Sequence, residues 1–352
     1  MRYSTTPRWI ACRLERGALA NPATRSLSRI WAACADPVRP VFLPAGPRLI
    51  GVGGATLGGS GKTPVSAALA SELRAAGLRV AVIASGYRVR ERVARRVLPQ
   101  DAASVLGDEA VALARQLTPL GVGVFVAKHR GSALELAARG EPDLIVLDGL
   151  LQARPQPLHV ALLVLDSAAP WGAGHCPPAG DLRAERSRLY RAADVLLVRR
   201  EPGREPCSLR QSSSGPVELC WSDEITGARS ADGEPSSIED LRRLRVGLVL
   251  GLARPERVER ELGRLGVFPA LSLFYADHAS LTPPRARLGK APRVEAWLTS
   301  AKCAAKLGKS FAGSPVLVLE QRVTLPAELL EICTGTARES ALRRGFFTAA
   351  PW

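Results

Sequence analysis

The stretch "GGATLGGSGKTP", from Gly53 to Pro64, decides the fold of this chain. Its glycines and its closing Gly-Lys-Thr are typical of a phosphate-binding loop, which stands between a strand and a helix. The general pattern G-x-x-x-x-G-K-[ST] has a glycine five positions before Gly61, where this chain has Thr56. The stretch is therefore either a nucleotide site with one unusual residue or a glycine-rich turn that resembles one.

The residues around the stretch favour the nucleotide site. An apolar strand-like run precedes it and a helix-like run follows it, which is the context that a phosphate loop needs. Glycines let backbone N–H groups converge on one anion, and the helix N-terminus adds its positive end. We expect Lys62 to reach the β- and γ-phosphates and the Thr63 hydroxyl to bind Mg²⁺, whereas Thr56 should matter less than the glycines after it. The predicted ATP-binding residues are Thr56, Gly58, Gly59, Ser60, Gly61, Lys62 and Thr63.

Apolar runs beyond the loop predict an α/β fold. Runs at 48–55, 79–87, 123–128, 143–149, 160–166 and 194–200 lack strict alternation, and helical patterns at 63–76 and 109–117 separate some of them. Such runs indicate a mostly parallel sheet covered by helices on both faces, as in P-loop NTPases. We predict a P-loop nucleotide-binding core over residues 47–200.

The rest of the chain divides into three predicted parts. Residues 201–335 form a smaller C-terminal α/β lobe with strands near 245–251, 271–278, 294–299 and 316–319, and residues 201–218 are expected to be a loop. Residues 336–352 are a C-terminal tail. Residues 1–46 are an N-terminal amphipathic segment with two short basic helices, broken at Asn21-Pro22. That segment either lies on an anionic membrane surface or packs on the protein with its arginines in water.

Composition excludes several classes of protein. The formal net charge is +15, but the arginines are spread along the chain, so no nucleic-acid partner is expected. Seven cysteines without C-x-x-C spacing predict reduced, mostly buried thiols. No run of about 18 to 20 apolar residues is present, so no full membrane span is expected.

Several acids and one histidine are candidates for chemistry. Asp148 follows four apolar residues in "LIVLDG" and can hold Mg²⁺ at the end of a strand, or it only caps a turn. Asp108 and Glu109 begin a predicted helix, where the helix dipole alone is the simpler explanation for acids. His278 follows Asp277 in "YADHASLT" and is either a structural histidine or a group that activates a hydroxyl.

Taken in order, the motifs of the chain resemble those of the tetraacyldisaccharide 4'-kinase family, the lipid A kinases of Gram-negative bacteria. The motifs extend from about residue 48 to about residue 306 and are "VGGATLGGSGKTP", "ASGY", "GDEA", "LDGLLQ", "GAGHCPPAGDLR", "GLARPER" and "YADHASLT". The phosphate loop of that family also carries threonine at the position of Thr56. The resemblance thus implies that the unusual residue is a family feature.

The resemblance implies a lipid-sugar kinase of lipid A and lipopolysaccharide biosynthesis. Such a kinase uses ATP and Mg²⁺ to phosphorylate the 4'-hydroxyl of a tetraacylated glucosamine disaccharide 1-phosphate. It works at the cytoplasmic face of the bacterial inner membrane, peripheral or monotopic, docked on the anionic surface by its N-terminal segment. By motif, Asp108 and His278 activate the sugar hydroxyl, while Thr63, Glu109 and Asp148 form the Mg²⁺ site.

The chain also departs from the family pattern. "DDGLQH" is here "LDGLLQA", so Leu147 replaces an acid, and "SRGYG" is "ASGYR", with Ser85 replacing an arginine. "TTEKD" is "TSAKC", which ends at Cys303 and lacks both acids. The phosphate, metal and base residues remain, so we predict a working kinase. The alternatives are a non-catalytic ATP-binding homologue or a kinase with another lipid or sugar acceptor. A partitioning-type ATPase is disfavoured, because the loop has no lysine before Lys62.

Overall fold

The structure, a computed structural model, describes residues 2–4, 6–34, 46–86, 89, 93–149, 158–201, 215–284 and 293–335. In this part of the chain the strands form one 15-stranded sheet. Its main path has the order β1-β12-β11-β13-β15-β9-β8-β7-β2-β6-β3-β5-β4. The predicted C-terminal tail lies outside the described residues.

Parallel strands form the half of the sheet that contains the phosphate loop. These strands are β2 (Arg48–Gly54), β3 (Val80–Ile83), β5 (Gly123–Val126), β6 (Leu144–Asp148), β7 (Val160–Asp166) and β8 (Val195–Arg199). β2 pairs with β6 on one side and with β7 on the other, so the loop leaves the middle of the sheet. Only β4 (Arg95–Val97) runs antiparallel there, beside β5, and the sequence did not predict it.

Helices cover both faces of these strands, which confirms the predicted α/β class. On one face α3 (Lys62–Ala75) and α5 (Asp108–Leu117) bury their apolar sides against alternate strand residues such as Ile50 and Val52. On the other face α6 (Arg130–Ala138) packs against Leu49, Ile145 and their neighbours. The alternation arises because successive strand side chains point to opposite faces. Short helices complete this half: α4 (Ala103–Leu106), η1 (Thr118–Leu120) and α7 (Arg186–Ala192).

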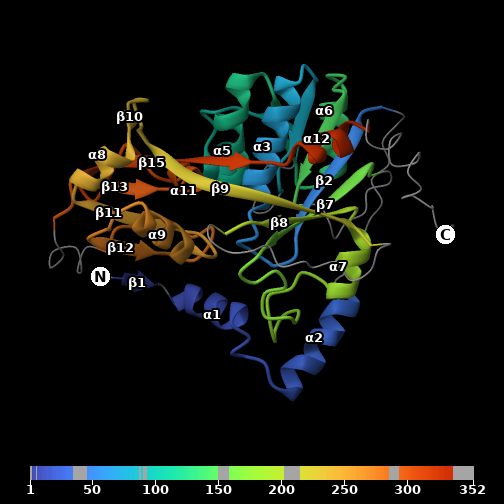
Figure 1. The fold of residues 1–352 in the computed structure, drawn as a ribbon, viewed down its shortest axis with the longest axis horizontal. Coiled ribbons are helices and arrows are strands. Elements are labelled where there is room, and N and C mark those ends of the chain that lie inside the picture. Colours follow the sequence, from blue (N-terminus) through green and yellow to red (C-terminus); the bar gives the residue numbers. More distant parts are fainter. Residues whose placement is uncertain are drawn as a thin grey trace.

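The long strand β9 (Val217–Ser230) joins the two halves of the sheet (Figure 1). Its first residues pair in parallel with β8, and its later residues pair antiparallel with β15 (Ser314–Thr324). The predicted loop over 201–218 therefore extended too far, since the strand begins at Val217. The sequence missed β9 because "VELCWSDEITGARS" is largely polar and has no continuous apolar run.

The remaining elements of the described chain include the predicted strands, the predicted helix after the first of them and four short elements that the sequence did not predict. The predicted ones are β11 (Val246–Leu250), β12 (Leu271–Phe274), β13 (Ala296–Thr299) and the helix α9 (Pro255–Arg264). The four others are α8 (Ile238–Arg243), α11 (Ala301–Ala304), β10 (Pro235–Ser236) and β14 (Ser310–Phe311). We call residues 46–201 the first lobe and residues 231–324 the second lobe. After the second lobe, α12 (Ala327–Thr334) returns to pack on α3. The domain boundary near residue 200 stays a prediction.

The N-terminal segment contains the two predicted helices, α1 (Thr6–Glu15) and α2 (Pro22–Cys34), after the short strand β1 (Arg2–Ser4). β1 pairs with β12 of the second lobe. α2 docks on the first lobe, where the Ser28 hydroxyl donates to the Cys176 carbonyl at 2.7 Å and Arg188 donates to the Ala32 carbonyl at 3.1 Å. No helix in the described part of the chain has the length and apolar character to cross a bilayer.

Candidate active site

The phosphate loop follows β2 directly and ends at the N-terminus of α3. Gly59 and Gly61 have φ angles of 77° and 89°, a left-handed backbone that favours glycine. Gly61 is the N-cap of α3, and no side chain caps that helix end in the described residues. Its first N–H groups therefore remain suited to an anion, as the sequence predicted.

The loop glycines also leave room for residues of β9 and of the second lobe. A Cβ built on Gly58 would lie 2.7 Å from the Cβ of Ala253, and one on Gly61 would lie 2.6 Å from the Trp221 ring. A Cβ built on Gly59 would lie 2.9 Å from the Arg254 side chain. Contacts this short are steric clashes, so the loop and the residues that pack on it require glycine at these positions.

Thr56 has a contact that glycine could not make. Its buried hydroxyl donates to the Gly58 carbonyl at 2.8 Å, across the start of the loop. Arg183 donates to the carbonyl oxygens of Thr56 and Leu57 at 2.8 and 3.0 Å. The threonine therefore fixes the backbone where the chain leaves the strand.

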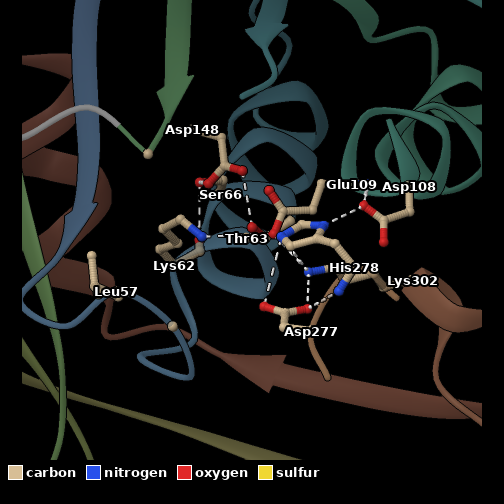
Figure 2. Close-up of polar contacts among 12 residues, drawn as sticks. Leu57, Lys62, Thr63, Ser66, Asp108, Glu109, Asp148, Asp277, His278 and Lys302 are labelled. Carbon is tan, nitrogen blue, oxygen red and sulfur yellow. Dashed lines mark hydrogen bonds and ion pairs between the residues drawn. The ribbon is translucent and has the colours of Figure 1, made fainter. Parts of the chain in front are cut away.

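Asp148 lies beside the loop at the carboxyl end of β6, adjacent to β2 (Figure 2). It accepts hydrogen bonds of 2.9 Å from the hydroxyls of Thr63 and Ser66, both on α3. Burial raises the pKa of its carboxyl, the charge of Lys62 lowers it, and the charge of Glu109 raises it again. Asp148 is therefore bound to the phosphate-loop helix, which the turn-capping alternative does not explain.

Leu147 shows where the missing acid of the family pattern would have stood. Its side chain is fully buried in the apolar cluster that contains Ala133 and Leu134 of α6. Leu147 and Asp148 are neighbours on one strand, so their side chains point to opposite faces. The substitution therefore adds to the core on the face away from Thr63.

Asp108 and His278, predicted from distant parts of the sequence, are in contact. His278 Nδ1 lies 2.9 Å from Asp108 Oδ1, although 170 positions separate the two residues. Asp108 begins α5 after Gly107, and His278 follows β12 with a φ of 59°, which is uncommon outside glycine. Such backbone strain is typical of functional sites. The dipole alone therefore does not account for Asp108.

Lys302, on α11, connects the second lobe to the same site and was missed by the sequence analysis. Its ammonium donates to Glu109 at 3.0 Å and to Asp277 at 2.7 Å, and it lies 3.3 Å from His278 Nε2 (Figure 2). Burial lowers the pKa of Lys302, but the charges of Glu109 and Asp277 raise it by more than burial lowers it. The ammonium therefore stays charged. Its signal was the lysine left in "TSAKC" after both acids were lost.

The charges around Asp108 keep it ionised. Burial raises the pKa of the Asp108 carboxyl, but the hydrogen bond to His278 and the charges of Lys302 and Lys306 hold it well below its usual range. Lys306 forms an ion pair with Asp108 Oδ2 at 2.9 Å. With Asp108 ionised, the tautomer of His278 that is protonated on Nδ1 donates its hydrogen to the carboxylate and leaves the ring's lone pair on Nε2.

Glu109 connects the phosphate loop to the residues around His278, because it pairs with a lysine from each. It forms ion pairs with Lys302 and, at 3.8 Å, with Lys62. Burial raises the pKa of its carboxyl, but the charges of Lys62 and Lys302 lower it to about 2. Glu109 makes no hydrogen bond to Thr63 or Asp148 in the structure, so the predicted metal residues are near one another without forming one cluster.

Two further arginines, also not predicted, add positive charge near the loop. Arg130 donates to the Gly149 carbonyl at 3.4 Å and, like Arg183, is attracted to Asp148 and Glu109. Burial lowers the pKa of both guanidinium groups. Their signal was weak, since isolated arginines are frequent in this chain. The phosphate end of the site is therefore strongly basic, as an ATP site requires.

Three comparisons relate the chain to known proteins. The profile of the family Tetraacyldisaccharide-1-P 4'-kinase matches residues 40–337. A tetraacyldisaccharide 4'-kinase of Anaeromyxobacter sp. (strain Fw109-5) is 34% identical over 325 residues, 86% of this chain and 84% of that protein. A protein of the same name from Dichelobacter nodosus (strain VCS1703A) is 30% identical over 289 residues, 82% of this chain and 84% of that protein.

A solved structure has the same fold. The structure of LpxK from Aquifex aeolicus in complex with ATP aligns with a TM-score of 0.65 and 20% sequence identity. The alignment covers 96% of this chain and 100% of that one. At this identity the likeness supports the fold, a mostly parallel sheet between helices.

Proposed function

Because this chain belongs to the tetraacyldisaccharide-1-P 4'-kinase family, we propose that it phosphorylates the 4'-hydroxyl of a tetraacylated glucosamine disaccharide 1-phosphate, using ATP, in lipid A biosynthesis. The observation that carries the mechanism is the 2.9 Å contact between Asp108 and His278 beside the phosphate loop. A protein that only binds ATP has no need of this pair. The geometry therefore supports the kinase over the non-catalytic alternative.

ATP binds with its phosphates at the loop from Thr56 to Thr63. The loop amides and the N-terminus of α3 hold the phosphates, and the Lys62 ammonium neutralises their charge. Phosphoryl transfer needs little covalent help from a protein, so the positioning of these groups is the main contribution of the first lobe.

Thr63, Asp148 and Glu109 are the residues that would hold Mg²⁺. The described residues contain no group of three or more His, Cys, Asp or Glu side chains ready for a metal ion. The hydroxyl and carboxylates still fit, because Mg²⁺ in kinases takes few protein ligands and completes its shell with phosphates and water. Bound there, Mg²⁺ supplies charge neutralisation on the β- and γ-phosphates.

The Asp108–His278 pair removes the proton of the attacking hydroxyl. Nε2 of His278 takes the proton as the sugar oxygen forms its bond to the γ-phosphorus and the bond to the ADP oxygen breaks. Ionised Asp108 stabilises the resulting imidazolium through Nδ1. In the structure Nε2 faces Lys302, so the sugar hydroxyl has to take the place of that ammonium.

The exposed face of α2 is the proposed membrane contact. Leu27, Ile30 and Trp31 are about half exposed, while Ser28 and Ala32 on the docked side are buried. Apolar side chains beside arginines suit an anionic lipid surface. Replacing the three exposed residues with serine should release the protein from anionic vesicles in a sedimentation assay without changing ATP binding.

Transfer of phosphate from labelled ATP tests the proposed function. Purified protein in detergent receives Mg²⁺ and the disaccharide 1-phosphate, and the lipid product is examined for a second phosphate. We expect phosphate at the 4'-position, and none with Lys62→Ala. Measurable ATP binding with no phosphorylated lipid would contradict this acceptor.

A further inference from the structure

Arg254 of the second lobe packs on the phosphate loop at Gly59. It precedes α9 as its N-cap residue, and its methylene carbons pack on Gly59 closely enough to exclude any side chain there. Its guanidinium forms ion pairs with Asp166 at 3.1 Å and with Asp181 at 3.7 Å. Both carboxylates are buried and belong to the first lobe.

The position of Asp166 connects this contact to the loop strand. β2 lies between β6 and β7, and each of these neighbours ends in a buried aspartate. Asp148 at the end of β6 holds the helix that follows the loop, through Thr63. Asp166 at the end of β7 holds Arg254. One neighbouring strand end therefore holds the helix that follows the loop, and the other holds the arginine that packs on Gly59.

We propose that Arg254 is a positioning residue that clamps Gly59 against the first lobe and keeps the phosphate loop in its ATP-binding shape. The stem of Arg254 covers the loop while the planar guanidinium bridges two carboxylates, a geometry that arginine provides and lysine does not. Since His278 is on the same lobe as Arg254, the clamp also sets the distance between the Asp108–His278 pair and the loop. This inference rests on the proposed function, because the loop shape matters only if ATP binds there.

Arg257, in the first turn of the helix that Arg254 precedes, is a matched control. Its guanidinium pairs with a buried carboxylate, Asp223, at 3.1 Å, and its side chain is 18% exposed, as is that of Arg254. Arg257 contacts β9, and the atoms nearest to a Cβ built on Gly58, Gly59 or Gly61 belong to other residues. Removing either arginine leaves a buried carboxylate with one partner fewer. Only removal of Arg254 releases Gly59.

The experiment measures the Kd for ATP by titration calorimetry and amide exchange over residues 57–63. Arg254→Ala should raise the Kd about tenfold, equal to about 1.4 kcal/mol, and speed exchange in the loop. Arg254→Lys should recover only part of the loss. Asp166→Asn should reproduce much of it, and Arg257→Ala should leave both readings unchanged even where it lowers the urea midpoint.

The outcomes separate the possibilities. Equal losses with Arg254→Ala and Arg257→Ala would overturn the clamp in favour of general loosening. A loss with Arg254→Ala that Asp166→Asn does not share would also overturn it, since Arg254 would then act on the nucleotide itself. Unchanged ATP binding in Arg254→Ala would refute the inference alone. Failure of the unaltered protein to bind ATP would instead refute the proposed function.

Discussion

Replacing Thr56 with glycine would restore the general phosphate-loop pattern, and we expect it to weaken ATP binding. The change removes a hydrogen bond to the Gly58 carbonyl, about 1 kcal/mol, and a buried methyl group, about 0.8 kcal/mol. It also frees the backbone, which costs about 0.5 kcal/mol or more. Together these terms favour the ordered loop by about 2 kcal/mol.

If the freed loop must be ordered again when ATP binds, the loss appears in the measured affinity. About 2 kcal/mol corresponds to a Kd for ATP about thirtyfold higher, measured by titration calorimetry. Two variants divide the effect. Thr56→Ser keeps the hydroxyl and should raise the Kd about fourfold, while Thr56→Val keeps the shape and should raise it about fivefold. A glycine variant that binds ATP as tightly as the unaltered protein would refute the reasoning.

Three further changes test other parts of the structure. Lys302→Met takes from Glu109, a proposed metal ligand, its 3.0 Å partner, so kcat should fall about tenfold or more in steady-state assays while the Kd for ATP changes little; an unchanged kcat would contradict this. Leu147→Asp, which restores the family acid, places a charge in an apolar cluster and should cost about 3 kcal/mol or more in urea unfolding, and a stability equal to that of the unaltered protein would show that the residue does not face the core. Burial raises the pKa of Cys333 to about 12, above the unfolded value near 8.5, so this stabilisation is complete below pH 8.5 and is lost as the pH rises toward 12. Urea unfolding from pH 8 to 11 should lose stability less steeply in Cys333→Ala, and parallel curves would contradict the assignment.

The sequence predicted the phosphate loop because its determinants are local. Glycine spacing, a preceding apolar strand and a following helix all lie within about 30 residues, and the structure has each of them. The α/β class followed for the same reason, since each buried parallel strand is one continuous apolar run. β9 was missed because its residues pair with two different strands, which no local pattern records.

The rest of the site depends on contacts between distant residues. Asp108 and His278 were separate candidates from the residues alone and became a predicted pair only through the motif resemblance, because nothing near either residue indicates that 170 positions of chain fold back. Lys302 left only the lysine of "TSAKC" as a signal and Arg254 left none, since their contacts with Glu109 and Asp166 cross between the lobes. Leu147 could be read as a lost ligand until the strand showed which face its side chain occupies.

The central claim is that the fold assembles a catalytic pair, Asp108 and His278, across its two lobes. The most direct measurement compares single-turnover phosphate transfer and the Kd for ATP in Asp108→Ala, His278→Ala and the double variant. We predict that each single change slows transfer by about 10² to 10⁴. The double variant should be no slower than the worse single variant, and the Kd for ATP should change by less than about threefold in all of them. Equal loss of ATP binding and transfer, or single effects that multiply in the double variant, would contradict the claim.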